Sequence, residues 1–319
     1  MLEELESISS NDAWELVDPP PGKRVLGCKW IFKLKRSTDD AIQRFKARIV
    51  AQGYNQQYGS EYDEVFAPVV RQTTFRVLMS VAAKRRMVVR QYDIKTAFLN
   101  GDLEEELYMR QPPGFVVKGA ENKVCRLKRS LYGLKQSARS WNNKLHQVLE
   151  SDGFKRTEVD PCLYSKQIKG KRCYILVYVD DLIVASEDEG LIGSIGRILE
   201  RNFETVSLGE VRNYVGIEVE RDTAGDYHIS QRKYIADIVK SAGLQDAKSS
   251  AIPIDVGYYK SDTGDKLLID NTEYQKLVGK LLFVAVNSRT DIAAPVSIMS
   301  RKLSCPTQRD WNELKRIVR

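Results

Sequence analysis

Two adjacent carboxylates, Asp180 and Asp181, lie inside an otherwise apolar run, C-Y-I-L-V-Y-V-D-D-L-I-V-A at residues 173–185. Burying a charge without a partner is costly, so buried ions are normally paired or bound to a metal. A β-hairpin with both acids at its tip would keep the flanking strands buried while the carboxylates face a cleft. Such oxygen ligands suit Mg²⁺, and two ions can clamp the attacking and leaving oxygens of phosphoryl transfer.

Two acids are too few to hold two ions well, so a third carboxylate should come from a neighbouring strand. Asp93 is the best candidate, because it follows the apolar stretch that begins at Val88. The alternatives are a helix N-cap for Asp93 and an ordinary hairpin turn for Asp180 and Asp181. Each alternative is plausible by itself, since pairs of Asp are common at turns.

Hydrophobic periodicity predicts the elements that would position these acids. Helices are expected at 2–10, 73–86, 137–153 and 187–203, and strands at 87–94, 161–167, 172–178, 182–185 and 213–221. After a boundary near Ile229, helical segments dominate at 234–241, 274–286 and 309–319. The sequence therefore predicts an α+β fold in the first two thirds and a helical final third.

A basic hairpin is predicted near the N-terminus. Residues 24–36 alternate apolar and basic side chains, 37–40 read as a turn, and 41–52 return as a second strand. Its cations are Lys33, Lys35, Arg36, Arg44, Lys46 and Arg48. Spacing alone slightly favours a solvated face over a surface that grips phosphates.

Composition narrows the class of protein. The 319 residues are 42% hydrophobic and 29% charged with a net charge of +7, as in a globular protein that tolerates a polyanion partner. Five scattered cysteines and two histidines argue against a zinc site and for reduced thiols. The acidic start does not resemble a signal peptide, and apolar runs are shorter than a membrane helix needs, so we expect a soluble intracellular protein.

Taken together, ordered blocks of sequence resemble the reverse transcriptase domain of copia-type LTR retrotransposon Pol polyproteins. One such block would be weak evidence, but the ordered set is very specific. The blocks are W-E-L-V (14–17), G-C-K-W-I-F-K-L-K (27–35), F-K-A-R-I-V-A-Q-G-Y (45–54), F-A-P-V (66–69), D-I-K-T-A-F-L-N-G-D-L (93–103), Y-M-R-Q-P-P-G-F (108–115), L-Y-G-L-K-Q (131–136), D-P-C-L-Y (160–164), Y-V-D-D (178–181), L-G-E-V-R-N-Y-V-G-I-E-V (208–219) and S-Q-R-K-Y-I (230–235).

The resemblance implies a right-hand polymerase with fingers, an antiparallel palm sheet and a helical thumb. The implied divisions are 1–86 for the first part of the fingers, 87–118 for the first part of the palm, 119–153 for the fingers and palm return, 154–228 for the palm with the Y-V-D-D hairpin and primer grip, and 229–319 for the thumb and start of the connection. Asp93, Asp180 and Asp181 would bind two Mg²⁺ ions, with Mn²⁺ as an alternative, and the backbone of Ile94 would lie beside the metal.

The resemblance implies further roles in binding the nucleotide and the primer. Phe98 matches a bulky gate that excludes a ribose 2′-hydroxyl, although its spacing alone favours a core aromatic residue. Residues expected around the triphosphate and the nucleotide pocket are Lys46, Arg48, Ile94, Thr96, Ala97, Tyr132, Gly133, Lys135 and Gln136. The primer-grip hairpin would comprise Tyr214, Val215, Gly216 and Ile217.

The implied partners are an RNA or DNA template with its primer, and dNTP substrates, without a membrane. A cytoplasmic virus-like particle is the implied location, with nuclear passage left open. The chain departs from the family at two lost prolines, at Ala138 and Thr290. Its end at Arg319, just before the family's ribonuclease H region, leads us to expect a piece of a larger product. The rival hypothesis is an inactive nucleic-acid-binding remnant, and a two-metal nuclease ranks third.

Overall fold

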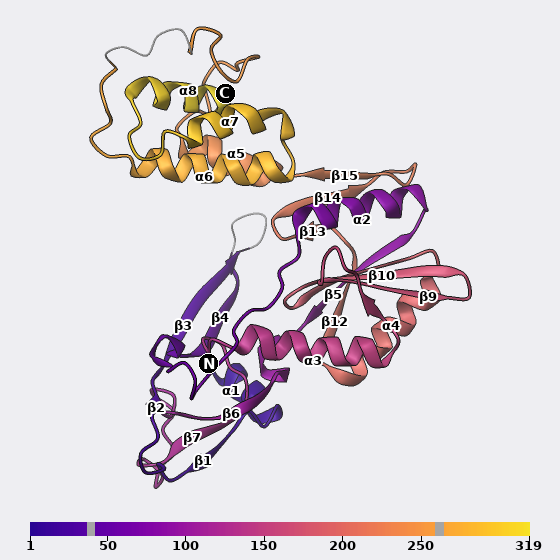
Figure 1. The fold of residues 1–319 in the computed structure, drawn as a ribbon, viewed down its shortest axis with the longest axis vertical. Helices are drawn as coiled ribbons and strands as arrows, with labels where there is room; N and C mark the ends of the chain where they lie inside the picture. Colours follow the sequence, from indigo (N-terminus) through magenta and orange to yellow (C-terminus); the bar gives the residue numbers. More distant parts are fainter. Residues whose placement is uncertain (37–41, 259–264) are drawn as a thin grey trace. The chain divides into compact units, whose positions relative to one another are not determined.

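A computed structural model describes residues 1–36, 42–258 and 265–319. The chain divides into two compact units, Met1–Glu210 and Val211–Arg319, which are described separately (Figure 1). Both units combine helices with strands, so the predicted mixture of helix and sheet is confirmed. The predicted turn at 37–40 lies outside the described residues.

The first unit carries three sheets and four α-helices among its described residues. Its strand order is β12-β5-β11-β10-β9-β8 in a six-stranded sheet, β1-β7-β6-β2 in a four-stranded sheet, and β3-β4 in a hairpin. The elements are α1 (Leu2–Ser10), β1 (Trp14–Val17), β2 (Val25–Leu26), β3 (Cys28–Arg36), β4 (Ile42–Ala51), η1 (Gly53–Asn55), α2 (Gln72–Lys84), β5 (Val88–Ile94), η2 (Ala97–Asn100), β6 (Asp102–Met109), β7 (Val124–Arg129), α3 (Ser137–Ser151), β8 (Lys155–Arg156), β9 (Leu163–Ile168), β10 (Lys171–Tyr178), β11 (Asp181–Ser186), α4 (Glu189–Asn202) and β12 (Thr205–Glu210).

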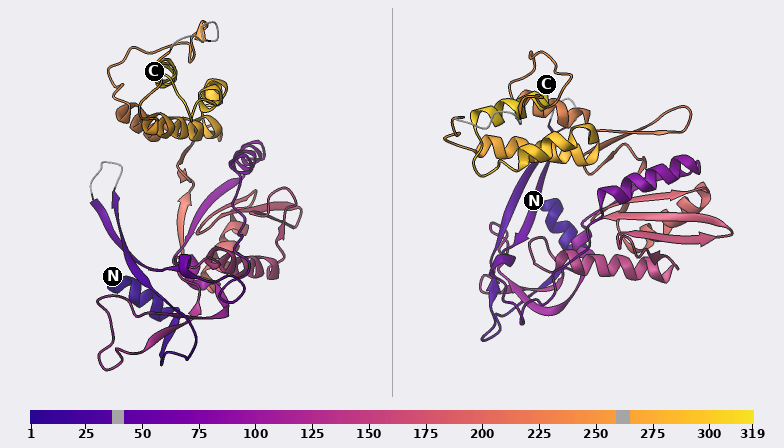
Figure 2. Two further views of the ribbon diagram at one scale, coloured as in Figure 1. Left: turned by 60° about the vertical axis from the view of Figure 1, so that its left-hand side comes forward. Right: turned by 45° about the horizontal axis from the view of Figure 1, so that its top comes forward.

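The six-stranded sheet is antiparallel and lies between helices, with α3 and α4 on one face and α2 on the other (Figures 1 and 2). Its strands bury Ile175, Val177 and Val184 against α3 and α4, which supply Trp141 and Ile195. The central strands are apolar on both faces because both faces are covered. Asp93, Asp180 and Asp181 are therefore placed at the end of the well-packed central strands of this sheet.

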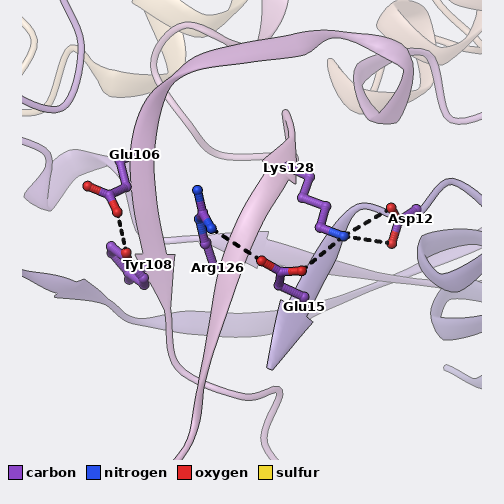
Figure 3. Close-up of polar contacts among 6 residues, drawn as sticks. All are labelled: Asp12, Glu15, Glu106, Tyr108, Arg126 and Lys128. Atoms are coloured by element: carbon purple, nitrogen blue, oxygen red, sulfur yellow. Dashed lines mark hydrogen bonds and ion pairs between the residues drawn. The ribbon is translucent and has the colours of Figure 1, made fainter. Parts of the chain in front are cut away.

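The four-stranded sheet is held partly by charge pairs across its strands (Figure 3). Lys128 on β7 binds Asp12 at 3.1 Å and Glu15 on β1 at 3.1 Å, and Arg126 binds Glu15 at 3.4 Å. These pairs join strands far apart in sequence, since β1 and β7 are antiparallel neighbours with Glu15 opposite Arg126. Each exposed pair contributes little by itself, but together the pairs help to fix the register.

The basic hairpin has two chemically different faces. Lys33 on β3 lies opposite Lys46 on β4, and Ile31 lies opposite Arg48. The other face is apolar, with Leu34 opposite Phe45. Alternation along each strand thus gathers the cations on one side of the hairpin.

The second unit contains a three-stranded sheet and a helical bundle. Its described elements are β13 (Asn213–Tyr214), β14 (Ile217–Arg221), β15 (Tyr227–Ser230), α5 (Arg232–Ser241), α6 (Thr272–Asn287), η4 (Thr290–Ile292), α7 (Ala293–Ser300) and α8 (Gln308–Val318). The helices enclose a core that includes Ile238, Leu281, Val296 and Leu314. The helical final third is confirmed.

The boundary between units lies at Glu210, earlier than the predicted boundary near Ile229. The reason is that β13, β14 and β15 form a separate three-stranded sheet, with β14 in the middle, and do not join the six-stranded sheet. The predicted single strand at 213–221 is wrong, because it is split into β13 and β14 by a turn at Val215 and Gly216. Within the described residues, the helices all fall short of the length and apolarity that crossing a membrane requires.

Candidate active site

Asp93 occupies the next-to-last position of β5, which is an interior strand of the six-stranded sheet. It lies directly opposite Asp181 on β11 and opposite Val206 on β12. A helix N-cap for Asp93 is thereby ruled out, since the residue belongs to a strand. Residues directly opposed in an antiparallel pair have Cβ atoms about 4.5–5.5 Å apart, so the register places these two carboxylates at one point.

Asp180 lies in the tight turn that joins β10 to β11. Tyr178 pairs with Asp181, which leaves Val179 and Asp180 as the two turn residues. Val179 has φ +55°, an unfavourable value for a β-branched residue. The turn is held from two sides, because Trp141 Nε1 donates to the Val179 carbonyl oxygen at 2.7 Å and the Ile94 amide donates to that of Asp180 at 2.8 Å.

Asp181 carries a charge that its surroundings disfavour. Burial, together with the neighbouring carboxylates of Asp180 and Asp93, raises the pKa of Asp181 to about 6. A hydrogen bond of 2.7 Å from Gln91 Nε2 to Asp181 Oδ1 opposes this shift in part. The site therefore has an excess of negative charge that a bound cation would relieve. In the parts of the chain that the structure describes, three or more Asp, Glu, His or Cys side chains nowhere form an arrangement ready to hold a metal ion.

The raised pKa predicts a pH dependence of stability without divalent ions. An unfolded Asp titrates near about 3.9, whereas Asp181 in the fold titrates at about 6. As pH falls, Asp181 therefore becomes protonated in the folded state before it does so in the unfolded state. The contribution of Asp181 to the free energy of unfolding accordingly rises as pH falls from about 7 to about 4. We expect Asp181→Asn to lose this contribution, measured as the difference between parent and variant in urea unfolding across pH with a chelator present. Identical pH profiles for the two proteins would contradict the raised pKa.

Gln91 and Trp141 contact the candidate site, and the sequence interpretation missed both. Gln91 lies two residues before Asp93 and hence on the same face of β5. A polar side chain within a largely apolar strand was the sequence signal that could have indicated Gln91 as a site residue. Trp141 lies in the helix predicted at 137–153, and its indole N–H reaches the Val179 carbonyl oxygen, 38 residues further along the chain.

Arg48, Tyr132 and Phe98 come together beside the acids. The Arg48 guanidinium lies 4.4 Å from the centre of the Tyr132 ring. The Tyr132 and Phe98 rings meet edge to face with their centres 5.0 Å apart. Phe98 belongs to η2, which begins after Thr96 at φ +49° and connects directly to the strand that carries Asp93. Lys46 lies two residues before Arg48, on the same face of β4.

The loop 131–136 is anchored to the N-terminal segment by close backbone contacts. The Ala51 amide donates to the Tyr132 carbonyl oxygen at 2.8 Å. Gly133 has φ +93°, and a Cβ there would lie 2.2 Å from the Ala51 carbonyl oxygen. Only glycine meets both conditions without strain.

Gly133→Ala should therefore destabilise the protein by about 3 kcal/mol, from backbone strain and steric overlap together. Gly59→Ala is a matched control, because Gly59 has φ +81° but open space around it. We expect that control to lose only about 1 kcal/mol, the cost of the left-handed conformation alone. Urea unfolding measures both values, and equal losses would show that the contact with Ala51 is unimportant.

Lys135 and Gln136 make protein contacts that limit what else they can touch. Lys135 Nζ donates to the Tyr62 hydroxyl at 2.7 Å and lies 4.2 Å from the centre of that ring. Gln136 is buried, donates to the Glu61 carbonyl oxygen at 3.0 Å and accepts from Gln56 Nε2 at 3.0 Å. The Gln136 amide thus supports the loop from inside. Ile94 and Ala97 also have buried side chains, so only their backbones are available to a ligand.

The predicted primer-grip residues form a tight hairpin in the second unit. Tyr214 pairs with Ile217, and the two turn residues, Val215 and Gly216, have φ of +48° and +79°. Positive φ at both central positions is the pattern of a type I′ turn. Tyr214 and Ile217 are fully buried, and a Cβ on Gly216 would lie 3.6 Å from the Phe283 ring.

Comparison with known proteins identifies the family of this chain. Residues 11–256 match the reverse transcriptase (RNA-dependent DNA polymerase) family. The chain is 39% identical over its whole length to the retrovirus-related Pol polyprotein from transposon TNT 1-94 of Nicotiana tabacum, and 38% identical to that from transposon RE2 of Arabidopsis thaliana. It spans 25% and 22% of the lengths of these two relatives.

The chain belongs to the reverse transcriptase family, and its relatives are the copia-type Pol polyproteins of transposons. The resemblance stated from the sequence blocks is thus confirmed. Among solved structures, it is similar to a foamy viral protease–reverse transcriptase in complex with double-stranded DNA, at 13% identity and a TM-score of 0.46. That similarity covers 99% of this chain and 47% of the other.

Proposed function

We propose that this chain is the RNA-directed DNA polymerase domain of a copia-type Pol polyprotein and adds templated dNTPs to a primer 3′-hydroxyl. The observation that supports it most strongly is the register of the sheet. Asp93 lies opposite Asp181, and Asp180 follows in the adjoining turn. Carboxylates from two distant segments thereby share one end of the sheet, as phosphoryl transfer assisted by two metal ions requires.

Asp93, Asp180 and Asp181, with the backbone of Ile94, are the proposed ligands of Mg²⁺, with Mn²⁺ as the alternative. Their chemistry fits, because all are oxygen donors and the raised pKa of Asp181 indicates uncompensated negative charge. The bound ions would lower the pKa of the primer 3′-hydroxyl and stabilise the pyrophosphate leaving group. Since the acids are not arranged as a complete site, substrate phosphates and water would complete the coordination.

Arg48, Lys46 and Phe98 are the proposed nucleotide contacts. The cations lie on one face of β4 and would neutralise the triphosphate. Tyr132 holds the Arg48 guanidinium by a cation–π contact and also supports the Phe98 ring. Phe98 would then close the space beside the sugar C2′ and exclude a ribose hydroxyl. Thr96, Ala97, Gly133, Lys135 and Gln136 would shape this pocket through the backbone and the contacts described above.

The remaining assignments follow from the same proposal. The basic hairpin would serve as fingers, the six-stranded sheet as palm and the helical bundle of the second unit as thumb. The turn at Val215 and Gly216 would let backbone approach the primer closely. RNA or DNA template and primer are the proposed partners, with affinity that falls steeply with salt. We further propose that the chain acts in a cytoplasmic virus-like particle.

Primer extension with an RNA template tests this function. Purified chain is incubated with a labelled primer, Mg²⁺ and one dNTP at a time. The proposal predicts that the added nucleotide follows the templating base. Salt-sensitive binding to the primer–template without any extension would instead favour the inactive remnant, and shortening of the primer would favour the nuclease.

A further inference from the structure

A basic concavity of about 460 Å³ lies at the far end of the six-stranded sheet from the acids. We call it the β8–β10 basic pocket. Arg172, near the start of β10, is six residues from Tyr178 at the acidic end, which corresponds to roughly 20 Å along the strand. The pocket is lined by Gly153, Lys155, Ser165, Lys166, Gln167, Arg172 and Tyr174.

Strand register gathers polar side chains of three neighbouring strands into this pocket. Ser165 on β9 lies opposite both Lys155 on β8 and Tyr174 on β10. Gln167 and Arg172 form the next pair along the same strands. These side chains alternate with those that pack against α3 and α4, such as Tyr164 and Cys173, and so project from the opposite face.

The lining contains three cations and no carboxylate. Of these, Lys166 lies opposite Cys173, on the face toward α3 and α4, and is paired at 2.9 Å with Asp152, a residue outside the lining. Lys155 and Arg172 are the cations on the pocket face. The hydrogen bond recorded for the Arg172 guanidinium is to a neutral group, the Tyr174 hydroxyl at 3.4 Å. Glu187, the acid that acts on Arg172 electrostatically, is itself bonded to Arg85 at 3.2 Å. The pocket therefore keeps an excess of positive charge beside neutral hydrogen-bonding groups.

Protection of a sheet edge does not explain this charge. Lysines on an edge strand do prevent unwanted strand pairing, and Lys155 on the edge strand β8 fits that role. Arg172 does not, because β10 is an interior strand between β9 and β11. The connection from Lys166 to Arg172, K-Q-I-K-G-K-R, adds further cations at the same end of the sheet. Such short basic runs are typical of nucleic-acid contacts.

We propose that the β8–β10 basic pocket binds the phosphate backbone of a nucleic-acid strand at a site separate from the acidic end of the sheet. The donors are side chains spread over three neighbouring strands, an extent that suits several phosphates of a polymer better than one isolated phosphate. An isolated phosphate is more often held by a helix N-terminus, and the pocket lining comes from strands and a turn. The inference does not depend on catalysis.

The test compares two double variants with the parent protein. Lys155→Gln with Arg172→Gln removes two cations from the pocket. Lys118→Gln with Lys123→Gln removes the same charge from an exposed loop before β7. Fluorescence anisotropy with a labelled single-stranded oligo-dT is recorded across salt concentrations. Each phosphate contact with single-stranded DNA contributes about 0.7 to the magnitude of the slope of log affinity against log salt. The pocket variant loses two contacts and should lower this magnitude by about 1.4, whereas the loop variant should leave the slope unchanged.

Ultraviolet cross-linking of the same oligonucleotide gives an independent readout. The parent is expected to cross-link at Tyr174 on the pocket wall, and the pocket variant to lose that cross-link. Equal slopes in all three proteins, equal losses in both variants, or no cross-link at Tyr174 would overturn the inference. Primer extension run in parallel separates the two proposals. Extension by the parent without a pocket effect refutes only this site, and a pocket effect without extension refutes only the polymerase function.

Discussion

Asp180→Asn should reduce the rate of primer extension by at least about 10³-fold. Removing one carboxylate from a centre that stabilises developing charge through bound metal forfeits about 4 kcal/mol or more of transition-state stabilisation. Asp180 lies in the turn beside Asp93 and Asp181, so its loss would affect both ions. The rate constant for single-nucleotide addition is measured with primer–template, dNTP and Mg²⁺ at saturation.

The fold should survive this substitution, because Asn has nearly the same shape as Asp. The substitution also removes one negative charge from the cluster of Asp93, Asp180 and Asp181, whose carboxylates repel one another. Asp246→Asn is the matched control, since it removes one exposed carboxylate from the second unit. That control is expected to extend primers at the parental rate. Extension by Asp180→Asn within tenfold of the parent would remove Asp180 from the catalytic centre.

Phe98→Val should weaken the discrimination between dNTP and rNTP by about 100-fold. The Phe98 ring is held edge to face against Tyr132, so its position is fixed. A smaller side chain would open space for a 2′-hydroxyl, and steric selection of this size is typical of a shaped pocket. The ratio of kcat/KM for the matching dNTP and rNTP measures the effect.

Phe98→Tyr is the control for this substitution, because it keeps a bulky ring at the gate. We expect the tyrosine variant to discriminate as the parent does. Phe98→Val also removes packing against the core of the six-stranded sheet, so its thermal stability is recorded beside the kinetics. If a folded Phe98→Val protein discriminated between dNTP and rNTP as the parent does, Phe98 would be a core aromatic residue and not a gate.

The sequence predicted those parts of the fold that local patterns control. The helix at 73–86 was predicted from hydrophobic periodicity, and α2 accordingly buries Phe75, Leu78 and Met79. Asp180 and Asp181 were placed at a hairpin because apolar strands flank them, and β10 and β11 confirm it. The two-residue turn inside 213–221 was missed by periodicity, since the apolar alternation runs through it.

Long-range register was beyond the reach of the sequence pattern. Spacing suggested that Asp93 ends a strand, but not that β5 lies between β11 and β12 with Asp93 opposite Asp181. The contact of Arg48 with Tyr132 and the burial of Gln136 depend on loops that meet only in the folded chain. The resemblance to a family supplied those roles in outline, and the packing determines which side chains remain available to a substrate.

The central claim is that acids from two separate segments form one centre for RNA-templated DNA synthesis. Asp93→Asn tests it most directly, because Asp93 alone comes from β5. Primer extension on an RNA template and primer–template affinity are measured on the same samples of parent and variant. Our account predicts templated extension by the parent, loss of extension by Asp93→Asn, and an unchanged Kd for the primer–template. Parental rates of extension in Asp93→Asn, or no extension by the parent, would contradict it.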